Sequence, residues 1–159
     1  MTHPRRAVIL AALALSLRPT WAETEAVVLT VQQAQQAPVQ LRLSDILALP
    51  QQEFQAHTPW YKGAAVFRGP LLRDVLAAAD VRAGQSLQAT ALDDYKINIP
   101  WADAQTHDVI VAHTINGLRL TPRTKGPLFV VYPFDDDPDL QAVKYYERSI
   151  WQLRTLDVQ

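Results

Sequence analysis

Apolar and polar positions alternate most regularly in the last third of the chain. The segment 108–114 places successive side chains on opposite faces of an extended strand. Asn116 and Gly117 supply the two positive-φ positions that a tight hairpin turn prefers, and Leu118 begins the return strand. The uninterrupted apolar run at 128–132 is typical of a strand that is buried on both faces. This part of the chain therefore predicts a hairpin followed by a core strand.

Weaker alternation predicts further strands. Two lie near the start, at 26–31 and 39–43, and a polar, glutamine-rich turn joins them as a hairpin. Two more, at 87–92 and 95–99, flank a turn that contains two aspartates. The apolar residues within 146–158 predict a closing strand.

Helical periodicity is clearest at 71–79, where four apolar residues share one face. Pro70 is expected at the first helical position, which needs no backbone N–H. A shorter helix is expected at 44–50 with Ser44 as its N-cap, and 101–107 predicts a short helix or an extended loop. The interspersed strands and helices indicate a single mixed α+β domain with its own core.

Residues 1–22 have the pattern of a secretory signal. Arg5 and Arg6 precede an apolar run at 7–17, and a small residue stands before the expected cleavage point. The run is shorter than the ~20 apolar residues that span a bilayer, although retention as an N-terminal anchor is an alternative. We therefore expect a domain at 23–159 that is exported to the periplasm and has no membrane span once the signal is removed.

Charge and cysteine content restrict the function. Without Arg5, Arg6 and Arg18, the chain keeps 12 basic and 16 acidic residues, a net charge of −4 with neutral histidines. This balance argues against nucleic acid or an anionic membrane as the main partner. The sequence contains no cysteine, so it offers neither a thiolate nucleophile nor a thiolate metal ligand.

Five segments, in the right order, resemble the oxidoreductase molybdopterin-binding domain family, to which the sulfite oxidases belong. The resemblance covers 43–158 and implies the sulfite-oxidase-like molybdopterin-binding fold, a single mixed α+β domain, with molybdopterin as its cofactor. The segments that carry it are 67–76, 91–100, 109–113, 116–120 and 125–133.

The resemblance also locates the expected metal ligand. In catalytic members a cysteine sulfur binds molybdenum from the loop that corresponds to 54–63. The nearest positions in this chain are His57 and Thr58, and neither reproduces a soft, anionic thiolate. The family's arginine beside the anionic cofactor falls on Phe129, which leaves Lys125 as the cation of that loop. We expect no metal site and assign no catalytic residue.

Several residues are candidates for a ligand pocket. Tyr95 matches the tyrosine that lines the substrate pocket in the family, or else it packs at a strand start with its hydroxyl in water. The passage 51–62 has no clear period and ends in aromatic and basic residues that could enclose a flat or anionic ligand. Alternatively, Trp60 fills the core and Lys62 is exposed. The pocket candidates are His57, Thr58, Trp60, Tyr61, Lys62, Tyr95 and Lys125.

Two other features have simpler interpretations. His113 lies on a predicted strand and is expected to be a structural histidine with its hydrogen bonds satisfied. The acidic run 135–139 lacks the glycine and glutamate of a calcium-binding loop, so a solvated loop is expected.

Two functions remain open. In the first, the fold has no redox turnover and binds a small molecule or a partner in the periplasm, such as a membrane sensor protein. In the second, it is a molybdopterin-dependent oxidoreductase with a substituted metal ligand and an external electron partner. The missing thiolate favours the first, and the order of the family segments favours the second.

Overall fold

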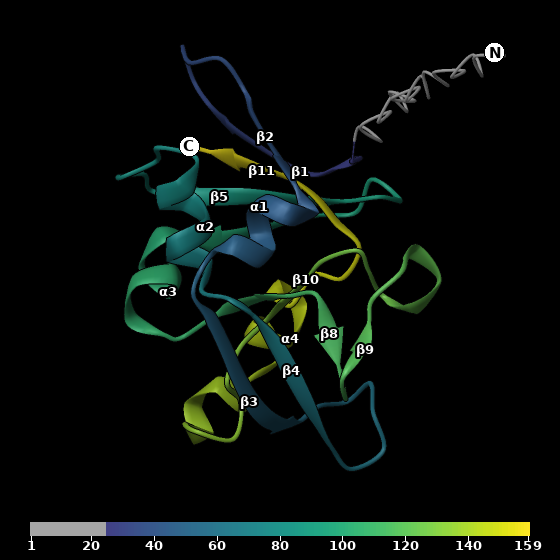
Figure 1. The fold of residues 1–159 in the computed structure, drawn as a ribbon. Coiled ribbons are helices and arrows are strands. Elements are labelled where there is room, and N and C mark those ends of the chain that lie inside the picture. Colours follow the sequence, from purple (N-terminus) through teal and green to yellow (C-terminus); the bar gives the residue numbers. More distant parts are fainter. Residues whose placement is uncertain (1–24) are drawn as a thin grey trace, which may run out of the picture.

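A five-stranded sheet forms one half of the molecule in this computed structural model, which describes residues 25–159. The predicted signal, 1–22, lies outside the described residues. Only β1 and β11 are parallel, with Thr30 opposite Thr155, and every other pair is antiparallel. The strand order is β2 (Val39–Arg42), β1 (Val27–Gln33), β11 (Leu153–Val158), β5 (Ser86–Ala91) and β6 (Lys96–Pro100), drawn across the top of Figure 1.

Two smaller sheets form the other half. One is four-stranded, in the order β3 (Gln51–His57), β4 (Ala64–Pro70), β8 (Thr114–Ile115) and β9 (Leu118–Arg119). The other pairs β7 (Ile110–Ala112) with β10 (Phe129–Val131). Backbone hydrogen bonds from Leu153 N to Leu128 O and from Val130 N to Ile150 O, both 2.9 Å, join β10 to the segment that enters β11. The run 128–132 therefore connects the two halves, and all five of its side chains are buried, as predicted.

Within residues 25–159, four short helices and two 3-10 turns complete the fold. The buried side chains of α2 include Leu72, Val75 and Leu76, so the predicted apolar face is confirmed. None of the helices within residues 25–159 has the length and apolar character that a bilayer crossing requires. The helices are α1 (Leu43–Ala48), α2 (Leu72–Ala78), α3 (Trp101–Thr106) and α4 (Val143–Arg148), and the turns are η1 (Pro122–Thr124) and η2 (Pro138–Gln141).

The predicted hairpin is confirmed. Asn116 and Gly117 have φ values of 51° and 75°, and they join β8 to β9. The Asn116 side chain also accepts a hydrogen bond from Val66 N at 2.8 Å, which ties the turn to β4. The turn residues therefore provide both the backbone geometry and an anchor to the neighbouring strand.

Two assignments of secondary structure were wrong. The passage interpreted as irregular contains β3, which pairs along its whole length with β4. Its outer residues are glutamines and a glutamate at a sheet edge, so the apolar signal of a strand is weak. The predicted strand 146–158 begins only at Leu153, because its first three residues belong to α4.

Two predicted helix starts were also wrong. The N-cap of the first helix is Arg42, whose backbone N–H donates to the Asp45 carboxylate at 2.7 Å, so Ser44 lies inside the helix. Pro70 ends β4, and α2 follows it at Leu72. Both differences arise because each helix directly continues a strand, so the cap position shifts by one or two residues.

The buried side chain of His113 is expected to make stability depend on pH. Its Nε2 donates to Gln51 Oε1 at 2.8 Å, whereas its Nδ1 has no partner among the described residues. Burial first, then the charges of Arg119 and Arg68, lowers the pKa of His113 below its ordinary value of 6.5. Below about pH 6.5, His113 therefore binds a proton more readily in the unfolded chain than in the folded chain. The free energy of unfolding falls as a result.

We expect the free energy of unfolding to decrease as the pH falls from about 8 to about 5, and less steeply in His113→Gln. Urea titrations across this range measure both slopes. Equal slopes for the two proteins would assign the pH effect to other groups.

Candidate functional site

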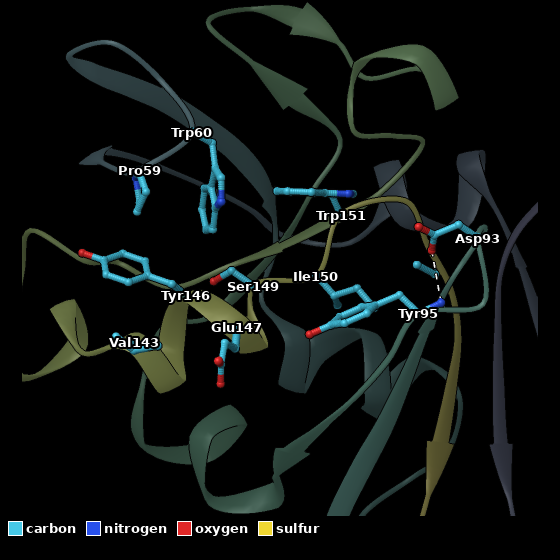
Figure 2. A pocket seen from close by; sticks show the side chains of 11 residues that line it. Pro59, Trp60, Asp93, Tyr95, Val143, Tyr146, Glu147, Ser149, Ile150 and Trp151 are labelled. Carbon is cyan, nitrogen blue, oxygen red and sulfur yellow. Dashed lines mark hydrogen bonds between the residues drawn. The ribbon is translucent and has the colours of Figure 1, made fainter.

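A concave groove with a volume of about 400 Å³ lies beside α4. Four aromatic side chains line it: Trp60 from the loop after β3, Tyr95 from the turn before β6, Tyr146 from α4, and Trp151 from the segment before β11 (Figure 2). We call it the aromatic groove. Its other lining residues are Pro59, Ala91, Asp93, Val143, Glu147, Ser149 and Ile150.

Trp60 packs against two other rings of the groove and helps to fix them. Trp60 meets Trp151 edge-to-face, with ring centroids 5.9 Å apart, and meets Tyr146 in the same way at 6.0 Å. Below them, Trp60 packs on the buried ring of Phe129 at 5.5 Å. Phe129 is therefore a core residue that supports the groove from beneath. Edge-to-face contacts of this kind hold the walls in one orientation.

Tyr95 owes its position to a tight turn. Asp94 has a φ of 67°, and the Asp93 carboxylate accepts the backbone N–H of Tyr95 at 3.1 Å. This is the structural role expected for an aspartate in that turn. Tyr95 is an exposed residue, and its hydroxyl points toward the middle of the groove (Figure 2).

A second, more polar hollow of about 390 Å³ adjoins the groove and shares Pro59 and Tyr146 with it. Here His57 Nδ1 lies 2.8 Å from Asp135, which also accepts the His57 backbone N–H at 3.0 Å. Partial burial acts to raise the pKa of Asp135, but the hydrogen bonds and charge of His57 outweigh it, and the pKa lies below its usual value. The Thr58 hydroxyl is buried and has no hydrogen-bond partner among the described residues.

The sequence candidates thus divide into three groups. Trp60 and Tyr95 line the aromatic groove, and His57 and Thr58 line the polar hollow. The other three, Tyr61, Lys62 and Lys125, line neither.

Tyr61, Lys62 and Lys125 lie outside both hollows for separate reasons. Lys62 is exposed, and Tyr61 packs on Phe67 with its pKa raised by burial. Lys125 Nζ lies 3.7 Å from the ring centroid of Trp151, a cation–π contact, and burial lowers its pKa.

A buried polar network behind the groove was not predicted. Asp103 on α3 accepts hydrogen bonds from the Tyr132 hydroxyl and from Arg148 on α4, both at 2.8 Å. Burial above all, together with the Asp103 charge, raises the pKa of Tyr132 far above its ordinary value. Tyr132 ends the apolar run that was predicted to be buried, and a buried tyrosine needs a hydrogen-bond partner for its hydroxyl. This requirement was the signal in the sequence for the network. The network fixes α4, which carries one wall of the groove.

The fold is that of a recognisable family. The model of the oxidoreductase molybdopterin binding domain matches residues 17–134, and the chain belongs to this family. The single α+β domain has the sulfite-oxidase-like molybdopterin-binding fold, as predicted.

Among solved structures, the chain is similar to the sulfane dehydrogenase SoxCD from Paracoccus pantotrophus, with a TM-score of 0.61 and 19% identity. The match covers 82% of this chain but only 37% of the SoxCD chain, so the likeness establishes the fold alone. No curated protein matches the sequence.

The residues at the expected cofactor position do not fit a molybdenum–pterin group. The family's metal ligand is a thiolate, and the chain has no cysteine. At the nearest positions, the Thr58 hydroxyl is neutral and enclosed, and His57 Nδ1 is already bonded to Asp135. Within residues 25–159, no lysine or arginine lines the aromatic groove to neutralise an anionic cofactor. The resemblance in sequence aligns Phe129 with the family's arginine. The described residues also contain no cluster of three or more side chains suited to a metal ion.

Proposed function

We propose that this protein is an exported member of the family that has no redox turnover and binds a small ligand in the aromatic groove. One observation carries the proposal: the groove keeps a well-formed wall of four aromatic rings, while the cysteine that redox chemistry needs is missing. The signal pattern of residues 1–22 supports a periplasmic location.

The groove has the ordinary features of a small-molecule site. Its volume of about 400 Å³ lies within the range of 300–1,000 Å³ that is usual for such sites. Most of its lining is apolar, and a few polar groups, among them the Tyr95 hydroxyl and Ser149, could fix a ligand's orientation. Because three of the four rings already pack on one another, these three have little order to gain on binding.

Ligand binding could be communicated to a partner protein. Val143 on α4 and Tyr95 belong to the groove and are also exposed apolar residues. They would present an apolar rim to a periplasmic partner, such as the outer domain of a membrane sensor. A bound ligand would change that rim directly, because it contacts the same residues.

Metal analysis tests the proposal. Protein exported from a host that makes molybdopterin, grown with ample molybdate, should contain no stoichiometric molybdenum and should release no fluorescent pterin after oxidation. A cysteine-containing family member exported from the same host is the positive control. Stoichiometric molybdenum in this chain would favour the alternative, a molybdopterin-dependent oxidoreductase with a substituted ligand and an external electron partner.

A further inference from the structure

Four aromatic rings line the aromatic groove, and the face of each ring carries negative potential. The face of an aromatic ring attracts a cation that lies within about 6 Å of the ring centroid, and tryptophan does so most strongly. Four such rings, two of them tryptophans, line the groove and are arranged around one hollow (Figure 2). A cationic ligand in the groove would be attracted wherever it lies over a ring face, but not where it meets a ring edge, which carries partial positive charge.

The charged residues of the lining have the same sign. Asp93 and Glu147 are the charged residues of the groove, and neither forms an ion pair with a described residue. They come from different elements, the turn before β6 and α4. Two unpaired carboxylates beside aromatic rings complement a positive ligand and repel an anionic one.

The basic residues near the groove are engaged elsewhere. Lys125 lies over the Trp151 ring without lining the groove. Arg148 is paired with Asp103 at 2.8 Å, and Arg154 with Asp94 at 2.7 Å. None of these cations neutralises Asp93 or Glu147.

We propose that the aromatic groove binds an organic ammonium ion, a primary or quaternary amine that carries a small apolar group. The inference rests on the proposed function and names the ligand class of the same site. A hydrated metal ion is a poorer match, because the wall is mostly apolar and the two carboxylates lie on separate elements.

Choline and its uncharged carbon isostere, dimethylbutanol, test the inference, with an alkyl sulfonate of similar size as the anionic probe. Tryptophan fluorescence and calorimetry on the intact exported protein measure binding. Choline should bind about tenfold more tightly than the isostere. The sulfonate should show no saturable binding.

Variants separate charge from shape. Glu147→Gln should weaken choline binding about fivefold and leave the isostere unchanged. Tyr95→Leu, at the exposed rim, should also weaken choline binding while the fold is retained. Glu53→Gln removes an exposed carboxylate on β3, outside the groove, and should change nothing.

Equal affinities for choline and the isostere, or tighter binding of the sulfonate, would contradict the inference that the ligand is cationic. Either result would still agree with the proposal that the groove binds a ligand. Failure of all three probes to bind would also overturn it. The molybdenum measurement decides the proposed function independently, so the two failures can be distinguished.

Discussion

Asp103→Ala is expected to lower the free energy of unfolding by about 3–5 kcal/mol, measured by urea or guanidinium titration with tryptophan fluorescence. The Asp103 and Arg148 side chains are only 10% and 20% exposed. Removing the carboxylate leaves the guanidinium buried without a counter-charge and the Tyr132 hydroxyl without an acceptor. Removing one partner of a buried ion pair lowers the free energy of unfolding by far more than the intact pair raises it.

A surface ion pair provides the matched control. Arg73 and Asp108 are joined at the same distance, 2.8 Å, but their side chains are 34% and 69% exposed. Asp108→Ala should therefore cost at most about 1 kcal/mol. If the two alanine variants lost the same stability, the buried network would contribute no more than a surface pair. Tyr132→Phe, which removes only one hydrogen bond, should fall between them.

Gly69→Ala is the second substitution with a large expected effect, a loss of about 3 kcal/mol or more. A Cβ at this position would meet the carbonyl oxygen of Val111 and lie 2.7 Å from the Cα of Ala112. These atoms belong to the backbone of β7, so no flexible side chain can move aside. The two strands would have to separate where His113 N donates to Arg68 O. Thermal or chemical unfolding measures the loss.

Gly63→Ala separates this clash from the general cost of replacing glycine. Gly63 has a φ of 77°, and a Cβ added at this position would have no neighbour within 4 Å. Its substitution should cost about 1 kcal/mol, through left-handed backbone strain alone. A cost for Gly69→Ala no greater than that of Gly63→Ala would show that β4 and β7 can move apart easily.

Local sequence patterns predicted the elements whose signal lies within a few neighbouring residues. The Asn116-Gly117 turn is one, because two adjacent residues determine its backbone geometry. The buried run 128–132 is another, because burial on both faces requires every side chain to be apolar. In contrast, β3 is an edge strand with mostly polar side chains, so its own sequence carries little strand signal. Its pairing with β4 makes it a strand.

The parts of the site that remained unpredicted depend on residues far apart in the sequence. His57 and Asp135 are 78 positions apart, and Asp103 and Arg148 are 45 apart. Each pairing exists because the fold brings together elements that are distant in the sequence, which residue spacing cannot reveal. Tyr95 was found because the family resemblance pointed to it. Tyr146 and Glu147 were missed because α4 was interpreted as part of a strand.

The position of β11 at the centre of the five-stranded sheet determines the order in which the sheet can assemble. The strands β1 and β2 form one hairpin and β5 and β6 form another, and the two hairpins share no backbone bond until β11 inserts between them. A nascent chain therefore carries two exposed strand edges until β11 is free to pair. A chaperone that shields open edges would act during this interval, before the groove beside α4 exists.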